Sequence, residues 1–208
     1  MYKTLHYAFL LFCQLFITSC DKDSEPIPPD PLPPAPSGPI NSVKGADISW
    51  ITEMENAGRK FYNSNGVEQD CITILKNLGM NTIRLRVWVN PTGGWNNSAD
   101  VVAKAVRANN KGMRIMIDFH YSDSWADTGK QNKPAAWSAM DFTSLKDAVS
   151  THTTSVMNAL KAQGITPEWV QVGNETNDGI LAGRRQFDAL RGHLLAKETI
   201  RNLDKHAG

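Results

Sequence analysis

The chain has 208 residues, of which 41% are apolar and 21% are charged, and its formal net charge is +1. This balance gives no support for a nucleic-acid partner, and it gives no sign of disorder beyond about the first forty residues. Three cysteines are too few to predict a fold that depends on disulfides.

The first segment of the chain has the features of an export signal. Residues 8–18, AFLLFCQLFIT, form an apolar stretch that is too short to span a bilayer as a stable helix. It leads into ITSC at positions 17–20, which resembles a bacterial lipobox, so we expect residues 1–20 to be a lipoprotein signal peptide and Cys20 to be acylated. An ordinary signal peptide with an incidental cysteine is the alternative, and the protein is then secreted. The acidic run at 21–25 resembles an export tag, so we expect a lipid anchor in the outer membrane and exposure at the cell surface.

A proline-dense segment follows the signal. Residues 21–44 include EPIPPDPLPPAPSGP at positions 25–39, which is expected to be extended, semi-rigid and unable to join a core. We interpret it as a linker between the membrane anchor and a globular domain that begins at Gly45.

Only one cysteine is expected to remain in that domain. Cys13 leaves with the signal, and Cys20 carries the lipid. Cys71 lies in an apolar helical pattern and is predicted to be an ordinary core thiol. We therefore expect no intramolecular disulfide.

Strand and helix patterns alternate along the domain from residue 45 to residue 181. Apolar runs rich in branched residues predict strands at 45–49, 82–89, 114–120 and 169–173. Helical spacing predicts helices at 67–78, 99–109 and 144–163, each followed by a glycine. Because each helical crossover returns the chain to the same end, these strands are predicted to form a parallel sheet.

Two α/β architectures satisfy this order, a doubly wound sheet and a (β/α)₈ TIM barrel. No glycine fingerprint follows the first strand, so a dinucleotide cofactor has little support. Instead, each predicted strand ends in large side chains that can form hydrogen bonds or carry charge. They are Asp47 in the first strand, Arg84, Arg86 and Trp88 in the second, Asp118 and His120 in the third, and Asn174 and Glu175 after the fourth. Since the strand ends of a barrel share one mouth, this pattern favours the TIM barrel, with strands one to four encoded in this chain.

The second and third predicted strands each place polar groups on one face. Alternation directs Arg84, Arg86 and Trp88 the same way. Two guanidinium groups inside a barrel require carboxylates to meet them there, unless the strand is a solvated edge with its charges outward. Asp118 and His120 share a face of the third strand, but no further histidine stands at ligand spacing, so no metal site is predicted.

The loop after the third strand mixes aromatic rings with short polar side chains. They are Tyr121, Trp125, Trp137, Asp123, Asp127 and Gln131. Aromatic rings can stack on the C–H face of a sugar while polar groups bond its hydroxyls. The loop therefore favours a carbohydrate ligand.

The fourth strand ends in an amide next to a carboxylate, Asn174 and Glu175. Hydrolysis of a glycosidic bond needs an acid that protonates the leaving oxygen and a second carboxylate across the sugar ring. Burial at a barrel mouth suits a glutamate to the first role. Glu175 is therefore the candidate acid/base, and Asn174 is a candidate to bond the sugar's 2-hydroxyl.

Several linked motifs resemble glycoside hydrolase family 53, in order and at suitable spacing over residues 45–181. They are GADIS at 45–49, RLRVWVNP at 84–91, DFHYSDSWAD at 118–127, Gln131 with Pro134, and VQVGNE at 170–175. The resemblance implies a (β/α)₈ barrel and a retaining endo-β-1,4-galactanase that acts, without a cofactor, on the (arabino)galactan side chains of pectin.

The resemblance also implies roles for single residues. Glu175 becomes the proton donor, and Arg84 becomes the arginine near the nucleophile. The expected substrate-binding residues are Asn174, Arg84, Arg86, Trp88, Asp118, His120, Trp125 and Asp127.

The nucleophile of the family, a second glutamate at the end of strand seven, has no counterpart in this chain. A full barrel takes about 250 residues. Residues 182–208 show no features of strand five, and we expect this tail to be read partly out of frame after truncation of the gene. Half a barrel leaves two edge strands, so we expect poor folding and little activity. Two alternatives stay open, a non-catalytic galactan-binding surface protein and a related enzyme that cleaves mannan or xylan.

Overall fold

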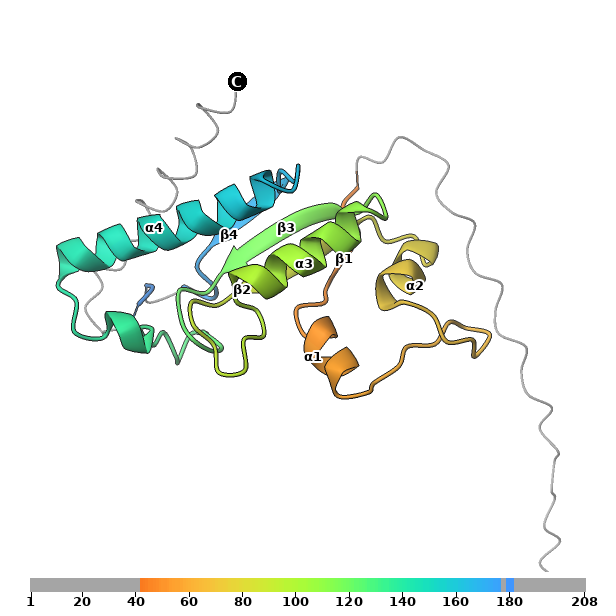
Figure 1. Ribbon diagram of the computed structural model, residues 1–208, viewed down its shortest axis with the longest axis horizontal. Coiled ribbons are helices and arrows are strands. Elements are labelled where there is room, and N and C mark those ends of the chain that lie inside the picture. Colours follow the sequence, from red (N-terminus) through yellow and green to blue (C-terminus); the bar gives the residue numbers. More distant parts are fainter. Residues whose placement is uncertain (1–41, 177–178, 182–208) are drawn as a thin grey trace, which may run out of the picture. The chain divides into compact units, whose positions relative to one another are not determined.

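The computed structural model describes residues 42–176 and 179–181, and these contain one parallel sheet with helices packed on it (Figure 1). In chain order the elements are β1 (Gly45–Asp47), α1 (Ile51–Asn56), α2 (Cys71–Asn77), β2 (Thr82–Val87), α3 (Ser98–Asn109), β3 (Arg114–Phe119), the 3₁₀ helix η1 (Ala135–Trp137), α4 (Phe142–Lys161) and β4 (Trp169–Val172). The predicted signal peptide, Cys20, the linker up to residue 41 and the tail at 182–208 lie outside the described residues.

The strands lie side by side in the order β1-β2-β3-β4, and every pair is parallel. A doubly wound sheet places its first strand in the interior, with later strands on both sides of it. Here β1 pairs only with β2 among the described strands, and each later strand adds to the same side. This consecutive order is that of a barrel wall.

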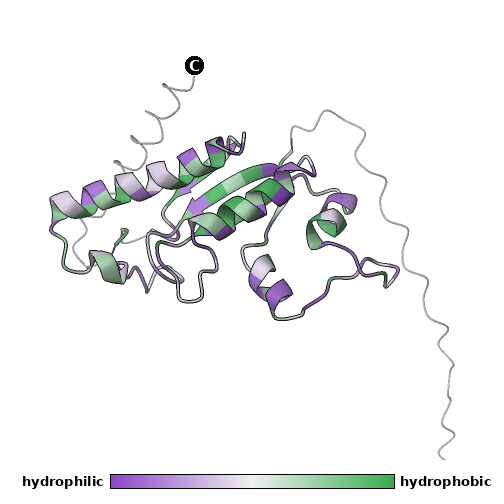
Figure 2. Ribbon diagram, in the orientation of Figure 1, coloured by the Kyte–Doolittle hydropathy of each residue, from purple (hydrophilic) through white to green (hydrophobic). Residues whose placement is uncertain are grey.

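The hydrophobic core lies between the sheet and its helices. Alternate residues of β2, Ile83, Leu85 and Val87, are fully buried on the face that α3 covers. Hydrophobic residues run along β3 and the neighbouring α3 (Figure 2). Burial of one strand face sets the register of the sheet, so the alternate residues Arg84 and Arg86 must point to the other face.

The helix predicted at 67–78 begins later than expected. Asp70 is the N-cap of α2, and its side chain accepts a hydrogen bond of 2.8 Å from the Thr73 N–H. Such a cap fixes the first helical residue as Cys71, and Val67 is exposed in the preceding turn. Cys71 is only partly buried, at the rim of the core, and burial raises the pKa of its thiol. The short helix α1 was not predicted from the sequence.

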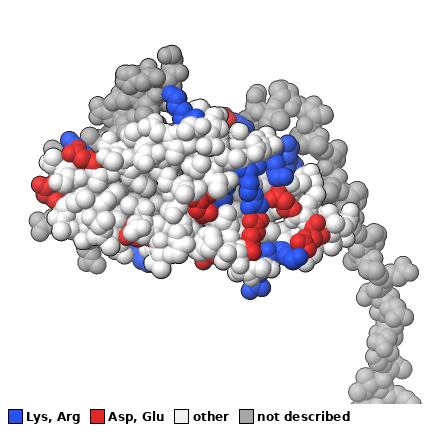
Figure 3. All heavy atoms as spheres, viewed as in Figure 1, with Lys and Arg blue, Asp and Glu red and all other residues white. Residues whose placement is uncertain are grey.

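An ion-pair cluster joins α1, α2 and α3. Arg107 of α3 bonds Glu55 of α1 at 2.7 Å and the α2 cap Asp70 at 2.6 Å, and Lys111 lies 3.4 Å from Asp70. Figure 3 shows acidic and basic groups side by side over these helices, while much of the remaining face is uncharged. Partial burial raises the pKa of Asp70, but the hydrogen bonds from Arg107 and Thr73 together have the larger effect. The net result is a pKa lowered to about 2. The cluster therefore ties the short helices α1 and α2 to α3.

His152 of α4 packs among three aromatic rings, with centroid distances of 5.9 Å to Phe119, 6.3 Å to Tyr121 and 6.0 Å to Trp137. Its Nε2 is buried and has no hydrogen-bond partner among the described residues. Burial disfavours the charged imidazolium and lowers the pKa of His152 to about 4.

This histidine predicts acid sensitivity of the fold. Between about pH 6.5 and pH 4 the unfolded chain takes up a proton that the folded chain does not, so the free energy of unfolding falls as pH falls, by up to about 1.4 kcal/mol per pH unit. Urea unfolding at pH 7 and pH 5 should show a loss of up to about 2 kcal/mol from this group. His152→Phe should reduce that loss, and an equal loss in the variant would contradict the assignment.

Among the described helices, none combines the length and the apolar character that a membrane crossing requires.

Candidate active site

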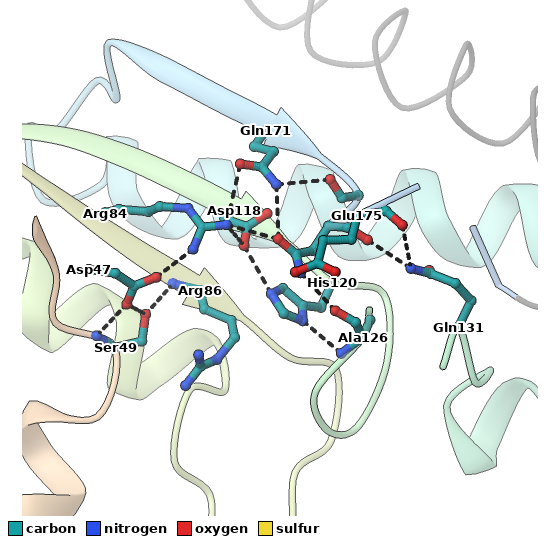
Figure 4. A network of polar contacts seen from close by, with 12 residues as sticks. Asp47, Ser49, Arg84, Arg86, Asp118, His120, Ala126, Gln131, Gln171 and Glu175 are labelled. Atoms are coloured by element: carbon teal, nitrogen blue, oxygen red, sulfur yellow. Dashed lines mark hydrogen bonds and ion pairs between the residues drawn. The ribbon is translucent and has the colours of Figure 1, made fainter. Parts of the chain in front are cut away.

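The polar side chains that close the four strands meet at the carboxyl edge of the sheet (Figure 4). The parallel register sets Asp47 beside Arg84, Arg86 beside Asp118, and Asp118 beside Gln171. Residues from all four strands are thereby brought to one edge, as the barrel prediction requires.

Arg84 is the centre of this network. Its Nη1 donates to Asp47 Oδ2 at 2.5 Å, and its Nη2 donates to Asp118 Oδ2 at 2.6 Å. The same Nη2 reaches the side-chain oxygens of Asn174 at 3.0 Å and Gln171 at 3.3 Å. One guanidinium therefore bridges the ends of all four strands, and for Arg84 the prediction of nearby carboxylates is confirmed.

Asp118 is a fully buried carboxylate held between Arg84 and His120. Its Oδ2 lies 2.9 Å from His120 Nε2, and the Ala126 N–H donates to His120 Nδ1 at 3.1 Å. Nδ1 must therefore carry a lone pair, so Nε2 carries the proton and donates it to Asp118. This fixes the imidazole ring and attaches the loop at Ala126 to the end of β3.

Asp47 is fixed by two neighbours. Its Oδ1 accepts hydrogen bonds from the Ser49 hydroxyl at 2.5 Å and the Ser49 N–H at 2.9 Å, while Arg84 bonds its Oδ2. Burial alone raises the pKa of Asp47, but the bonds from Ser49 and Arg84 lower it more, so it ends below its usual range. Asp47 therefore stays ionised beside Arg84.

Arg86 has a different environment from the one predicted. Its side chain is 2% exposed, and no carboxylate of the described residues bonds it. Its guanidinium carbon instead lies 4.3 Å from the ring centroid of Trp125, 4.7 Å from Trp88 and 5.1 Å from Trp50, and it points away from the Arg84 network (Figure 4). The expectation that carboxylates meet both arginines is wrong here, because cation–π contacts replace them. Burial lowers the pKa of Arg86.

The turn after β4 presents Asn174 and Glu175. Asn174 is buried, its Nδ2 donates to the Ala126 carbonyl at 2.7 Å, and its own carbonyl accepts from Gln131 Nε2 at 2.7 Å. Glu175 has a positive φ of 47° and is exposed. Among the described residues its carboxylate accepts only a long bond of 3.4 Å, from the Thr128 N–H. The burial expected for Glu175 is thus absent within the described part of the chain.

The aromatic residues of the loop after β3 separate into two groups. Tyr121 and Trp137 are buried in the cluster around His152, so the expectation that they serve a ligand is wrong. Trp125 is 37% exposed, and its ring lies edge-on to the His120 ring at 5.4 Å. Trp125 is therefore the loop aromatic that faces the site.

Trp88 and Asp127 border the site without joining the Arg84 network. The Trp88 ring lies edge-on to His120 at 6.4 Å. The Asp127 carboxylate accepts from the Gly129 N–H at 2.8 Å, and this bond closes a local turn. Only the backbone carbonyl of Asp127 reaches toward the site, by accepting from Gln131 at 3.0 Å.

A cavity of about 500 Å³ opens beside the Arg84 network. Its lining includes the charged residues Asp47, Arg84 and Arg86, the indoles of Trp50 and Trp125, and Met54, Phe61 and Cys71. No group of three or more metal-ligating side chains occurs in the described residues. The edge of the sheet combines fixed charges, exposed indoles and, after β4, the exposed carboxylate of Glu175, which suits recognition of a polar, ring-shaped ligand.

Residues 43–205 match the sequence profile described as glycosyl hydrolase family 53. The chain belongs to this family. It is 41% identical over 148 residues to the endo-β-1,4-galactanase of Bacillus subtilis and 39% identical over 140 residues to the arabinogalactan endo-β-1,4-galactanase A of Emericella nidulans. These alignments cover 66% and 67% of this chain but only 34% and 40% of the relatives, so the chain spans about two-fifths of their length or less.

Solved structures of family 53 agree with the fold. The Ignisphaera aggregans GH53 catalytic domain superposes with a TM-score of 0.76 at 33% identity, covering 84% of this chain and 52% of that one. A fungal β-1,4-galactanase superposes with a TM-score of 0.73 at 38% identity, covering 77% and 49%. The four parallel strands are therefore part of a family 53 TIM barrel. The profile match extends to residue 205, beyond residue 181, where the resemblance in the sequence motifs ends.

Sequence reasoning missed three residues that shape this family 53 site. Lys104 of α3 is fully buried and donates to the Ser49 carbonyl at 2.6 Å and to the side chains of Asn96 and Asp100, each at 2.8 Å. Ser49 and Trp50 lie two and three residues after the end of β1 and line the cavity. Lys104 lies on the helix face that Val101, Ala105 and Ala108 bury, so a charge at a core position was the available signal.

Proposed function

We propose that this protein acts in the endo-hydrolysis of β-1,4-galactosidic bonds in (arabino)galactan by a retaining double displacement, with Glu175 as the acid/base. The observation that carries the proposal is the exposed carboxylate of Glu175 after β4, next to an asparagine held in place by Arg84, Gln171 and Ala126. The names of the family 53 relatives support β-1,4-galactan as the substrate.

The groups around Glu175 have separate tasks in this proposal. Glu175 donates its proton to the leaving glycosidic oxygen and later takes one from water. Within the described residues only one Nδ2 hydrogen of Asn174 has a partner, which leaves the other for the sugar's 2-hydroxyl. Arg84 donates a charge-assisted hydrogen bond to the oxygen of that amide, and Asp118 in turn holds Arg84.

The retaining mechanism also needs a carboxylate nucleophile across the sugar ring. Asp47 and Asp118 are the acidic residues of the described network, and each is bound to Arg84 and to a second partner. Neither is free to attack the anomeric carbon. We therefore assign the nucleophile to a part of the barrel beyond these four strands.

Because the nucleophile is assigned beyond these four strands, release of reducing ends from β-1,4-galactan tests the assignment of Glu175 in the protein with the complete barrel. Glu175→Gln should lower turnover by about 10²- to 10⁴-fold, because the amide cannot donate or take the proton. Glu168→Gln is the matched control, since this glutamate precedes β4 at the opposite edge of the sheet and pairs with Arg114. Full activity of Glu175→Gln would refute the assignment.

The exposure of Glu175 favours a second candidate, a galactan-binding protein without catalysis. A general acid works best when burial tunes its pKa toward the working pH, and the described residues leave Glu175 exposed. Retention of the protein with the complete barrel on a galactan gel, without release of reducing ends, would replace the first candidate by this one.

A further inference from the structure

Lys104 of α3 is a fully buried cation that joins two of the loops at the carboxyl edge of the sheet. Its Nζ donates to the Ser49 carbonyl at 2.6 Å, to Asn96 Oδ1 at 2.8 Å and to Asp100 Oδ2 at 2.8 Å. These bonds use all three N–H groups of the ammonium, and Asp100, one helical turn away, neutralises its charge. A lysine is rarely buried unless it is paired in this way, so the groups that it bonds indicate what it holds in place.

One set of these contacts fixes the loop after β2. Asn96 is fully buried and has a positive φ of 64°, which is uncommon for residues other than glycine. The Asn96 N–H donates to Asp100 Oδ2 at 2.6 Å, and the Asn96 carbonyl accepts from the Trp88 N–H at 2.8 Å. Lys104 bonds both Asn96 and Asp100, so it holds the path by which the chain leaves β2 and enters α3.

The remaining contact reaches the charged network of the site through Ser49. The Ser49 N–H and hydroxyl both donate to Asp47 Oδ1, at 2.9 Å and 2.5 Å, and the hydroxyl accepts from the Arg86 N–H at 2.8 Å. Ser49 is therefore bonded through its carbonyl, its N–H and its hydroxyl at once, and its orientation toward Asp47 depends on Lys104.

Asp47 extends this series of contacts to the candidate acid (Figure 4). Its Oδ2 accepts from Arg84 Nη1 at 2.5 Å, and Arg84 Nη2 donates to Asn174 Oδ1 at 3.0 Å. Asn174 immediately precedes Glu175. A continuous series of direct hydrogen bonds thus leads from a helix that covers the core face of the sheet to the turn after β4.

We propose that Lys104 is a positioning residue for the hydrolysis proposed above, on which this inference rests. By holding Ser49, Lys104 orients the Asp47 carboxylate. Asp47 in turn orients Arg84, and so the amide next to the candidate acid. Lys104 is fully buried and has no exposed surface with which to touch a sugar. A group that maintains geometry without binding substrate affects kcat more than KM, because small misplacements of the reacting groups slow the chemical step.

Amide hydrogen exchange of the full chain, followed by NMR, tests the first contact of this series. Lys104→Met retains an apolar side chain of similar length but removes the three donors, so the Ser49 N–H should exchange about tenfold faster or more. The Ile165 N–H is the reference, because it is buried beyond the end of α4 and bonds the Leu160 carbonyl at 3.1 Å. Equal acceleration at Ser49 and Ile165 would mean that Lys104 only stabilises the fold, and the inference would fail.

Asp100→Asn is the matched control within the same cluster. It weakens the pairing of Lys104 but leaves the bond to the Ser49 carbonyl, so exchange at the Ser49 N–H should stay within about twofold of the parent. The double variant Lys104→Met with Asp100→Asn removes the carboxylate charge that methionine would leave unpaired. It should still show fast exchange at Ser49, and it keeps the test decisive if Lys104→Met alone does not fold.

Activity on β-1,4-galactan tests the positioning role in the protein with the complete barrel. Lys104→Met should lower kcat by about tenfold to a hundredfold and leave KM within about twofold. Asp100→Asn should keep kcat within about threefold of the parent. An unchanged kcat of Lys104→Met in an active parent would refute this inference alone. Absence of hydrolysis by the parent would instead refute the proposed function, and with it the catalytic use of Lys104.

Discussion

Arg84→Met is expected to lower the free energy of unfolding by about 3–5 kcal/mol, because it leaves a buried charge without its cation. Asp118 is fully buried, and its Oδ1 has no hydrogen-bond partner among the described residues. Without Arg84 its carboxylate keeps only the bond from His120. Asp47, Gln171 and Asn174 lose a donor at the same time, so the ends of all four strands lose their common link.

Urea unfolding of three variants separates this cause from a general loss of packing. Asp118→Asn removes the buried charge that Arg84 neutralises. The loss in free energy of unfolding of the double variant Arg84→Met with Asp118→Asn should therefore be smaller than the sum of the two single losses, by about 0.5–3 kcal/mol. Arg114→Met removes an arginine from the start of β3 that pairs with the half-exposed Glu168, and it should cost about 1 kcal/mol or less. Additive costs for Arg84→Met and Asp118→Asn would show that the two residues are not coupled.

The sequence predicted side-chain orientation correctly where the two-residue alternation of a β-strand determines it. Alternation along β2 places Ile83 and Leu85 under α3 and Arg84 and Arg86 on the other face, as predicted. Tyr121, which the sequence predicted to face a ligand, is instead in the core, where its ring stacks on Phe119 at 5.4 Å. Tyr121 lies outside β3 and has a positive φ of 52°, so its burial depends on a backbone turn that sequence reasoning did not foresee.

Contacts between distant segments were beyond the reach of pattern reasoning. Three indoles surround Arg86, and two of them, Trp50 and Trp125, come from loops whose paths no local pattern fixes. A carboxylate was the reasonable expectation for a buried guanidinium, but aromatic rings meet the same electrostatic need. The exposure of Glu175 was unpredictable for a similar reason, because burial at a strand tip depends on every neighbouring loop.

The consecutive spatial order of the strands explains why the strand ends meet. In a parallel sheet with consecutive strands, each strand enters the same edge beside its predecessor, so residues at equivalent positions become neighbours. Asp47, Arg84 and Asp118 were predicted to converge on this ground, and the structure brings them within hydrogen-bond distance. The alternation of residues along the strands does not predict which of these side chains bond one another. In the structure one arginine, Arg84, lies between the two aspartates.

Gly173→Ala is expected to lower the free energy of unfolding by about 2–5 kcal/mol and to displace the Asn174–Glu175 turn. Gly173 has a φ of +91°, which side chains rarely tolerate. A Cβ there would lie 2.5 Å from Thr176 Cγ2 and 2.6 Å from Ile180 Cγ2, so atoms must move as well. Galactotetraose affinity should fall with stability, because Asn174 and Glu175 follow the turn directly.

Gly164→Ala separates the two causes, since Gly164 has a φ of +70° but nothing within 4 Å of an added Cβ. Gly164→Ala should lower the free energy of unfolding only by the energy of the strained backbone, about 1–2 kcal/mol. The excess cost of Gly173→Ala then measures the crowding against Thr176 and Ile180, about 1–3 kcal/mol. If urea unfolding shows the same loss in free energy of unfolding for Gly173→Ala and Gly164→Ala, the turn after β4 can shift to accommodate the added methyl group without further loss of stability. A turn that yields could not hold Glu175 in the fixed geometry that proton transfer to a bound sugar requires.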